Sequence, residues 1–237
     1  MNRGRDPARS TREPPDGGTV STFDPGSNVL VRGSSLAGKR GLALALLAAL
    51  PVDECPVVLS AATDPEQLQR RLVDAGSADP GDRWYVIDAV RSRVDGERIA
   101  CTDGGGDRRT WYVASPGDLT GIGMSTSRAL SAVTETGDRP RVLVDSLSTL
   151  LQYSSSERVY RFLHVFNGRV AAVGGVSIQV VHADAHAART VGTLAHLFDV
   201  VFDVHAGDDE SVTVRTGRSS AVSLPMGELL SNLTAMA

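Results

Sequence analysis

The chain has 237 residues and a formal net charge of −4, from 28 acidic and 24 basic side chains. Its hydrophobic content of 41 % supports a sizeable core, which excludes a wholly disordered or fibrous chain. The mild acidity disfavours a strongly basic nucleic-acid-binding protein. Two cysteines are too few for a disulfide framework or a four-cysteine zinc site, so we expect a reducing, cytoplasmic setting. The longest apolar run is too short to span a membrane.

Residues 1–26 contain proline, glycine, serine and alternating charges, and they show no apolar periodicity. We expect this leader to be disordered, because it buries too little apolar surface to offset the entropy lost on ordering. Its arginines are balanced by acidic residues, which argues against a nucleic-acid-binding arm. Residues 27–237 are expected to form one domain.

After the leader, short apolar segments alternate with helical patterns. The segments expected to be strands are 28–32, 56–60, 84–88, 141–145, 176–182 and 200–205. Five helices are expected. The first follows the first loop and ends at Leu50, the second starts at an N-cap at Asp64, and the third covers 122–136. The fourth starts at a capping box of Ser154 and Glu157, and the fifth is a short helix that ends at His196. Residues 91–115 are expected to be irregular β structure, and 212–224 a hairpin. This alternation predicts an α/β fold with three αβα layers, a mostly parallel central sheet and a C-terminal antiparallel hairpin.

Only one of the 24 basic residues is a lysine, and it lies in a glycine-rich segment after the first strand. This segment matches the phosphate-binding loop G-x-x-x-x-G-K-[ST] at every position but the last, with Gly33, Ser34, Ser35, Leu36, Ala37, Gly38, Lys39 and Arg40. The glycines let backbone N–H groups converge on an anion at a helix N-terminus, and the lysine reaches the outer phosphates. Lysine and arginine are not interchangeable in a tight loop, so the retained lysine favours a phosphate site over a chance glycine turn.

Arg40 departs from the loop pattern, because the usual hydroxyl at this position coordinates Mg²⁺ and a guanidinium cannot be a metal ligand. Two interpretations stay open. Arg40 points away and Mg²⁺ is held weakly, or its charge takes over part of the neutralising role of the metal. Both weaken the case for fast hydrolysis.

Asp145 ends the apolar strand VLVD and is a candidate Mg²⁺ ligand opposite the loop. The alternative is structural, since Asp145 or Ser146 could simply start the next helix. The loop earlier in the chain favours the metal-binding interpretation.

These segments resemble the RecA-like ATPases of the KaiC type. The resemblance rests on the loop at 33–39, on VLVDSLSTL around Asp145, on DPEQLQRRL at 64–72 and on the closing hairpin, and it covers about residues 24–224. It implies a central parallel sheet in which one inserted strand separates the strands of the loop and of Asp145. It also implies ATP bound between the subunits of a ring or filament.

The chain differs from the KaiC type at the positions of two glutamates that serve hydrolysis. That family carries a pair of glutamates just before the helix that begins here at Pro65, and one of them polarises the attacking water. Ala62 and Thr63 stand at those positions, and neither can act as a general base. Asp64 is the nearest carboxylate, but it is better used as a helix cap.

Three further basic residues, Arg215, Arg218 and His182, are candidates for nucleotide contact. Arg215 and Arg218 resemble the family's pair that reaches a neighbour's nucleotide, although Arg218 lies one residue further along; exposed hairpin charges are the alternative. His182 ends a buried strand and could sense the γ-phosphate, but a strand-end histidine with satisfied hydrogen bonds is the plainer interpretation. His186 follows four residues later, yet no further ligand completes a metal site.

The sequence therefore predicts a protein that binds ATP, with Mg²⁺ held weakly, and hydrolyses it slowly or not at all. No catalytic residue is assigned. Such a protein would act through its conformational state, in regulation or signalling, as a homo-oligomer or with a signalling protein. One alternative is a working Mg²⁺-dependent ATPase that takes its base from Asp64 or a partner, and another is an interaction module that has lost nucleotide binding. Membrane and nucleic-acid partners are not expected.

Overall fold

A computed structural model describes residues 23–75, 84–90, 102–103, 109–207, 210–217 and 221–235. The described residues form one sheet of ten strands in the order β10-β9-β8-β1-β7-β6-β2-β3-β5-β4. The strands are β1 (Asn28–Gly33), β2 (Glu54–Ser60), β3 (Tyr85–Asp88), β4 (Thr102–Asp103), β5 (Arg109–Tyr112), β6 (Arg139–Val144), β7 (Val176–His182), β8 (Val200–His205), β9 (Ser211–Thr216) and β10 (Val222–Pro225). The pairs from β8 across to β5 are parallel, whereas β9 pairs antiparallel with β8 and β10, as β4 does with β5. The mostly parallel sheet and the C-terminal antiparallel hairpin are confirmed.

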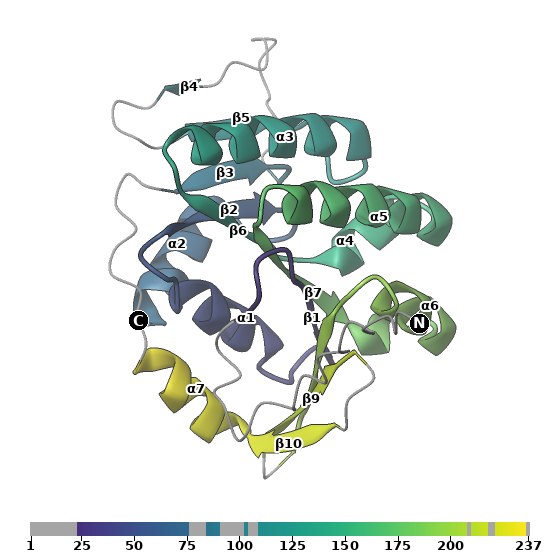
Figure 1. Ribbon diagram of the computed structural model, residues 1–237. Helices are drawn as coiled ribbons and strands as arrows, with labels where there is room; N and C mark the ends of the chain where they lie inside the picture. Colours follow the sequence, from purple (N-terminus) through teal and green to yellow (C-terminus); the bar gives the residue numbers. More distant parts are fainter. Residues whose placement is uncertain are drawn as a thin grey trace, which may run out of the picture.

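Helices cover both faces of this sheet (Figure 1). They are α1 (Lys39–Ala48), α2 (Pro65–Asp74), α3 (Leu119–Glu135), α4 (Leu147–Tyr153), α5 (Ser156–Ala172), α6 (Ala188–Ala195) and α7 (Met226–Thr234), with a 3-10 turn η1 (Ala183–Ala185) after β7. Side chains of α1, α2 and α7 pack into one hydrophobic core, and those of α3 to α6 into a second. Two cores on opposite faces of one sheet make the three αβα layers that the sequence predicts.

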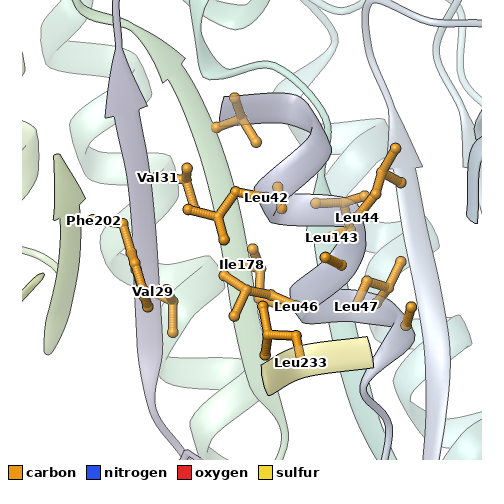
Figure 2. Packing of buried hydrophobic residues seen from close by; sticks show 14 of the residues in the cluster. Val29, Val31, Leu42, Leu44, Leu46, Leu47, Leu143, Ile178, Phe202 and Leu233 are labelled. Atoms are coloured by element: carbon orange, nitrogen blue, oxygen red, sulfur yellow. The ribbon is translucent and has the colours of Figure 1, made fainter. Parts of the chain in front are cut away.

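The first core surrounds α1, which is apolar on nearly all sides and correspondingly buried. Figure 2 shows Leu42 and Leu46 of α1 among the strand residues Val31 and Ile178, with Leu233 of α7 beside them. Leu42, Leu46 and Leu233 are each no more than 1 % exposed. The helix that follows the loop is therefore held between the sheet and the C-terminal helix.

The carboxyl ends of the central strands meet at one edge of the sheet. In the parallel register Gly33 of β1 lies opposite His182 of β7 and Val204 of β8. Strand β6 is the other neighbour of β7, and Asp145 follows its last residue. One strand thus separates the strands of the loop and of Asp145, as the resemblance implies.

The helical elements differ from the sequence predictions in two places. The N-cap of α5 is Ser155, whose hydroxyl accepts from the N–H of Arg158, and not Ser154. Helix α7 was not predicted. The N-cap at Asp64 is confirmed, since its side chain accepts from the N–H of Glu66. The alternative in which Ser146 starts the next helix is also confirmed, because Ser146 is the N-cap of α4.

Parts of three predicted segments lie outside the described residues. The leader expected over 1–26 is described only at 23–26, the segment 91–115 only at 102–103 and from 109 onward, and the hairpin expected over 212–224 only at 212–217 and 221–224. Within the described ranges, no helix is both long and apolar enough to cross a membrane.

Candidate phosphate-binding site

Two glycines give the loop at 33–40 its shape. Gly38 adopts a left-handed conformation, with φ of 68°, and is the N-cap of α1. Gly33 ends β1 so close to β8 that a Cβ at this position would lie 2.6 Å from the carbonyl oxygen of Val204. Between them the N–H of Ala37 donates to the Ser34 carbonyl at 3.1 Å, which closes a turn. The backbone therefore curls back on itself directly ahead of the helix.

Lys39 is the first residue of α1 and is only 2 % exposed. Its Nζ donates to the Ser34 carbonyl oxygen at 2.5 Å, so the side chain folds back over the loop. Burial lowers the pKa of the Lys39 ammonium, the nearby Asp184 carboxylate opposes this shift, and Arg40 adds to it. The only lysine of the chain thus lies inside the loop.

Arg40 is half-buried, and its charge acts on the site around it. It contributes to the lowered pKa values of Lys39 and His182, and it opposes the raised pKa of Asp145. Arg40 therefore lies within electrostatic reach of Asp145, which follows β6, and of His182, which ends β7. The structure thus brings together Lys39, Arg40, Asp145 and His182 at one edge of the sheet.

Asp184 in η1 is a residue of this site that the sequence analysis missed. Its Oδ2 accepts from the backbone N–H of Ser35 at 3.0 Å, and its Oδ1 lies 3.2 Å from the Ser35 hydroxyl, which donates to it. These hydrogen bonds lower the pKa of the exposed Asp184 carboxyl. The contact joins residues 149 positions apart and depends on the pairing of β1 with β7, so no local sequence signal could have revealed it.

Asp145 is fully buried, and its carboxylate binds backbone N–H groups of the loop between β2 and α2. Oδ1 accepts from Ala61 at 2.7 Å, Oδ2 accepts from Thr63 at 2.7 Å, and both oxygens lie within 3.2 Å of the Ala62 nitrogen. Burial raises the pKa of the Asp145 carboxyl, and these hydrogen bonds oppose that rise. The contacts give Asp145 a structural role, and its role as a metal ligand stays a prediction.

The same loop carries the positions where the KaiC type has its glutamates. The N–H groups of Ala62 and Thr63 point to Asp145, and the Ser60 hydroxyl donates to the Thr63 carbonyl. Asp64 caps α2. Residues 62–64 therefore supply backbone N–H donors and a helix cap. Hydrolysis would require a general base at this place to activate the attacking water.

His182 lies at the end of β7 beside the loop. Its backbone N–H donates to the Ser148 hydroxyl at 2.9 Å, which ties β7 to α4. Burial, together with Lys39 and Arg40, lowers the pKa of its imidazole. Within the described parts of the chain, neither Nδ1 of His182 nor Nε2 of His186 has a hydrogen-bond partner. Contact of His182 with a γ-phosphate stays a prediction.

Of the two hairpin arginines only Arg215 lies in the described residues; Arg218 lies outside them. Arg215 forms an ion pair with Asp203 of β8, which also pairs with Arg32 of β1. Its side chain remains 50 % exposed. A role toward a neighbouring subunit stays a prediction that would require Arg215 to leave Asp203.

An open cleft of about 860 Å³ lies along the same edge, lined by residues from the β8–β9 connection, β10 and the start of α7, among them Glu210, Leu224 and Gly227. The residue before Gly227, Met226, begins α7 beside the loop, since a Cβ at Gly38 would lie 3.9 Å from its methyl group. Cleft and loop are therefore neighbours.

The site suits phosphate better than Mg²⁺. Backbone N–H groups, Lys39 and Arg40 supply donors and positive charge for phosphate oxygens. A magnesium site needs oxygen ligands, but Arg40 replaces the hydroxyl and Asp145 already accepts from the backbone of residues 61–63. No group of three or more histidine, cysteine, aspartate or glutamate side chains in the described residues could hold a metal ion.

A family model described as a family of unknown function, DUF7504, matches residues 26–204, which is most of the chain. The chain belongs to DUF7504. No curated protein matches this DUF7504 chain.

The DUF7504 chain shares its fold with a solved structure. The KaiC-like protein PH0186 from the hyperthermophilic archaeon Pyrococcus horikoshii OT3 superposes with a TM-score of 0.60, at 17 % sequence identity and over 86 % of each chain. At this identity the similarity establishes the fold alone. The RecA/KaiC-like architecture expected from the motifs is thus confirmed.

Proposed function

We propose that this protein binds a nucleotide such as ATP through the loop at 33–40, with hydrolysis slow or absent, and acts through its bound state in regulation or signalling. The observation that carries the proposal is the loop itself. A buried lysine, a left-handed glycine and the first turn of α1 come together at the carboxyl edge of a parallel sheet. This is the arrangement in which α/β proteins bind phosphate groups.

The loop already binds one anionic group, the carboxylate of Asp184. The N–H of Ser35 donates to Asp184, which shows that a backbone donor of the loop faces an anionic oxygen. The neighbouring cleft of about 860 Å³ has the size of a small-molecule site and could receive the nucleoside. We propose that the phosphates lie on the loop and the nucleoside lies toward α7.

Slow hydrolysis follows from the groups that surround the loop. Ala62 and Thr63 replace the carboxylates that would activate water, and Asp64 caps a helix. The guanidinium of Arg40 would supply positive charge where KaiC-type proteins use Mg²⁺. Nucleotide binding would therefore depend only weakly on the metal. Assembly into a ring or filament is part of the resemblance and remains a proposal here.

Replacing Lys39 by alanine tests the proposal. In the wild-type protein, millimolar ATP should raise the melting temperature, because a ligand that binds only the folded state stabilises it. Lys39→Ala should remove this shift, since the ammonium that reaches the phosphates is lost. Differential scanning fluorimetry with and without ATP measures both.

The matched control is Arg70→Ala, which removes one positive charge from an exposed position of α2. It should keep the full ATP shift. Circular dichroism checks that Lys39→Ala is folded. If the wild-type protein shows no shift at millimolar ATP, nucleotide binding is wrong and the interaction module without a nucleotide becomes the better account.

A further inference from the structure

Asp184 lies on the loop because of strand register. Gly33, the last residue of β1, lies opposite His182, the last residue of β7, so the turns after the two strands are neighbours. The first turn carries Ser35 and the second carries Asp184. Both oxygens of the Asp184 carboxylate accept hydrogen bonds from Ser35, one from its N–H and the other from its hydroxyl.

A carboxylate in this position resembles the ligand of the loop. Phosphate and carboxylate oxygens accept hydrogen bonds from the same backbone N–H groups, and both are attracted to an ammonium. Ser35 is one of the four residues between the two loop glycines, where a phosphate-binding loop directs its N–H groups to the ligand. The charge of Lys39 also acts on Asp184.

We propose that Asp184 is a built-in competitor of the ligand: its carboxylate occupies a phosphate position of the loop and must leave before an anionic ligand is fully bound. The inference rests on the proposed phosphate binding by the loop. It adds that Asp184 occupies part of the site in the protein without ligand. The affinity for the ligand then depends on how much more strongly the loop binds phosphate than it binds the Asp184 carboxylate.

The position of Asp184 allows such a release. The side chain is exposed and belongs to a 3-10 turn of three residues between β7 and α6, none of which is buried. Rotation about its side-chain bonds would free Ser35 without disturbing either hydrophobic core. Release would leave one carboxylate facing water, which solvates it well.

The opposite role would give the opposite result. If Asp184 instead held a cation on the bound phosphates, its removal would weaken binding in the presence of that cation. If it only shaped the loop, its removal would weaken binding with or without a cation. The sign of the change in affinity therefore separates competition from both alternatives.

The test compares Asp184→Asn with the wild-type protein in calorimetric titrations with pyrophosphate, once with EDTA to remove divalent cations and once with Mg²⁺ present. The variant keeps the size of the side chain but loses the charge, and should bind pyrophosphate about fivefold more tightly under both conditions. The control Asp74→Asn makes the same charge change at an exposed position at the end of α2 and should bind like the wild type. Equal or weaker binding by Asp184→Asn than by the wild type under either condition would overturn the inference.

A second measurement needs no ligand. In the nuclear magnetic resonance spectrum of the free protein, the Ser35 amide signal should shift in Asp184→Asn and stay in place in Asp74→Asn. An unchanged Ser35 signal in Asp184→Asn would show that the contact is absent, and would overturn the inference while wild-type pyrophosphate binding still supports the proposed function. If neither protein binds pyrophosphate, the proposed function fails, and the competition fails with it.

Discussion

At the scale of single residues, the hydrogen bonds of Asp145 give its carboxylate a structural role. A carboxylate that holds Mg²⁺ needs lone pairs free for the metal or its waters. Here both oxygens accept from the backbone N–H groups of residues 61–63, in a fully buried position. Asp145 therefore fixes the loop between β2 and α2 against the end of β6.

Asp145→Asn should destabilise the protein. The carboxamide has one acceptor oxygen, and its NH₂ group would face N–H donors, so at least one buried donor loses its partner. We expect the free energy of unfolding to fall by about 2–4 kcal/mol, measured by urea denaturation. Asp74→Asn should leave the free energy of unfolding nearly unchanged. If Asp145→Asn is as stable as the wild type and loses only a Mg²⁺ effect, the structural role is wrong.

Sequence patterns could predict the loop but not its surroundings. Glycine spacing and the lone lysine identify residues 33–40, because the required backbone conformation is local. The partners of Asp145 and of Ser35 lie at least 82 positions away in the chain, so they follow from strand order and register. Contacts of this kind become visible only once the sheet is assembled.

At the scale of elements, a buried ion pair anchors the helix that follows the loop. Arg141 of β6 is 1 % exposed, and its Nε donates to Glu54 at 2.6 Å. Its NH1 group donates to the carbonyls of Leu46 and Ala49 at the C-terminal end of α1. A cation at the C-terminal end of a helix donates hydrogen bonds to carbonyl groups that lack a partner within the helix. It also interacts favourably with the helix dipole.

Arg141→Ala should be strongly destabilising, whereas Arg139→Ala should not. Removing Arg141 leaves Glu54 without its closest cation in the interior, which should cost about 3–5 kcal/mol. Arg139, two residues earlier on the same strand, pairs mainly with the exposed Asp53 and lies farther from Glu54, at 3.6 Å, so its loss should cost less than about 1 kcal/mol. Urea unfolding of the two variants measures the difference. Similar losses would contradict the anchoring role.

The elements themselves were largely predictable, with informative exceptions. Buried parallel strands are continuous apolar runs, and Asp64 followed by Pro65 marks a helix start, so both signals are strong. Helix α4 has only seven residues and begins in a serine-rich segment that is equally typical of a turn. Helix α7 does carry a signal, since its buried Met226, Leu229 and Leu233 have helical spacing.

At the scale of the whole molecule, the chain has the RecA/KaiC-like architecture, and Ala62 and Thr63 stand where the KaiC type carries its glutamates. The two hydrophobic cores and the anchored α1 hold the loop at 33–40 in place. Lys39 and Arg40 give this loop positive charge. These observations favour our proposal that the loop binds an anionic ligand and that hydrolysis is slow or absent.

Isothermal titration calorimetry with a non-hydrolysable ATP analogue, with and without Mg²⁺, measures whether the loop binds a nucleotide without the metal. We expect saturable binding at one site, with affinities that differ by less than about tenfold between the two conditions, because we propose that Arg40 supplies charge that a metal would otherwise provide. Binding that requires Mg²⁺ would contradict the proposed role of Arg40, and no binding under either condition would contradict nucleotide binding itself.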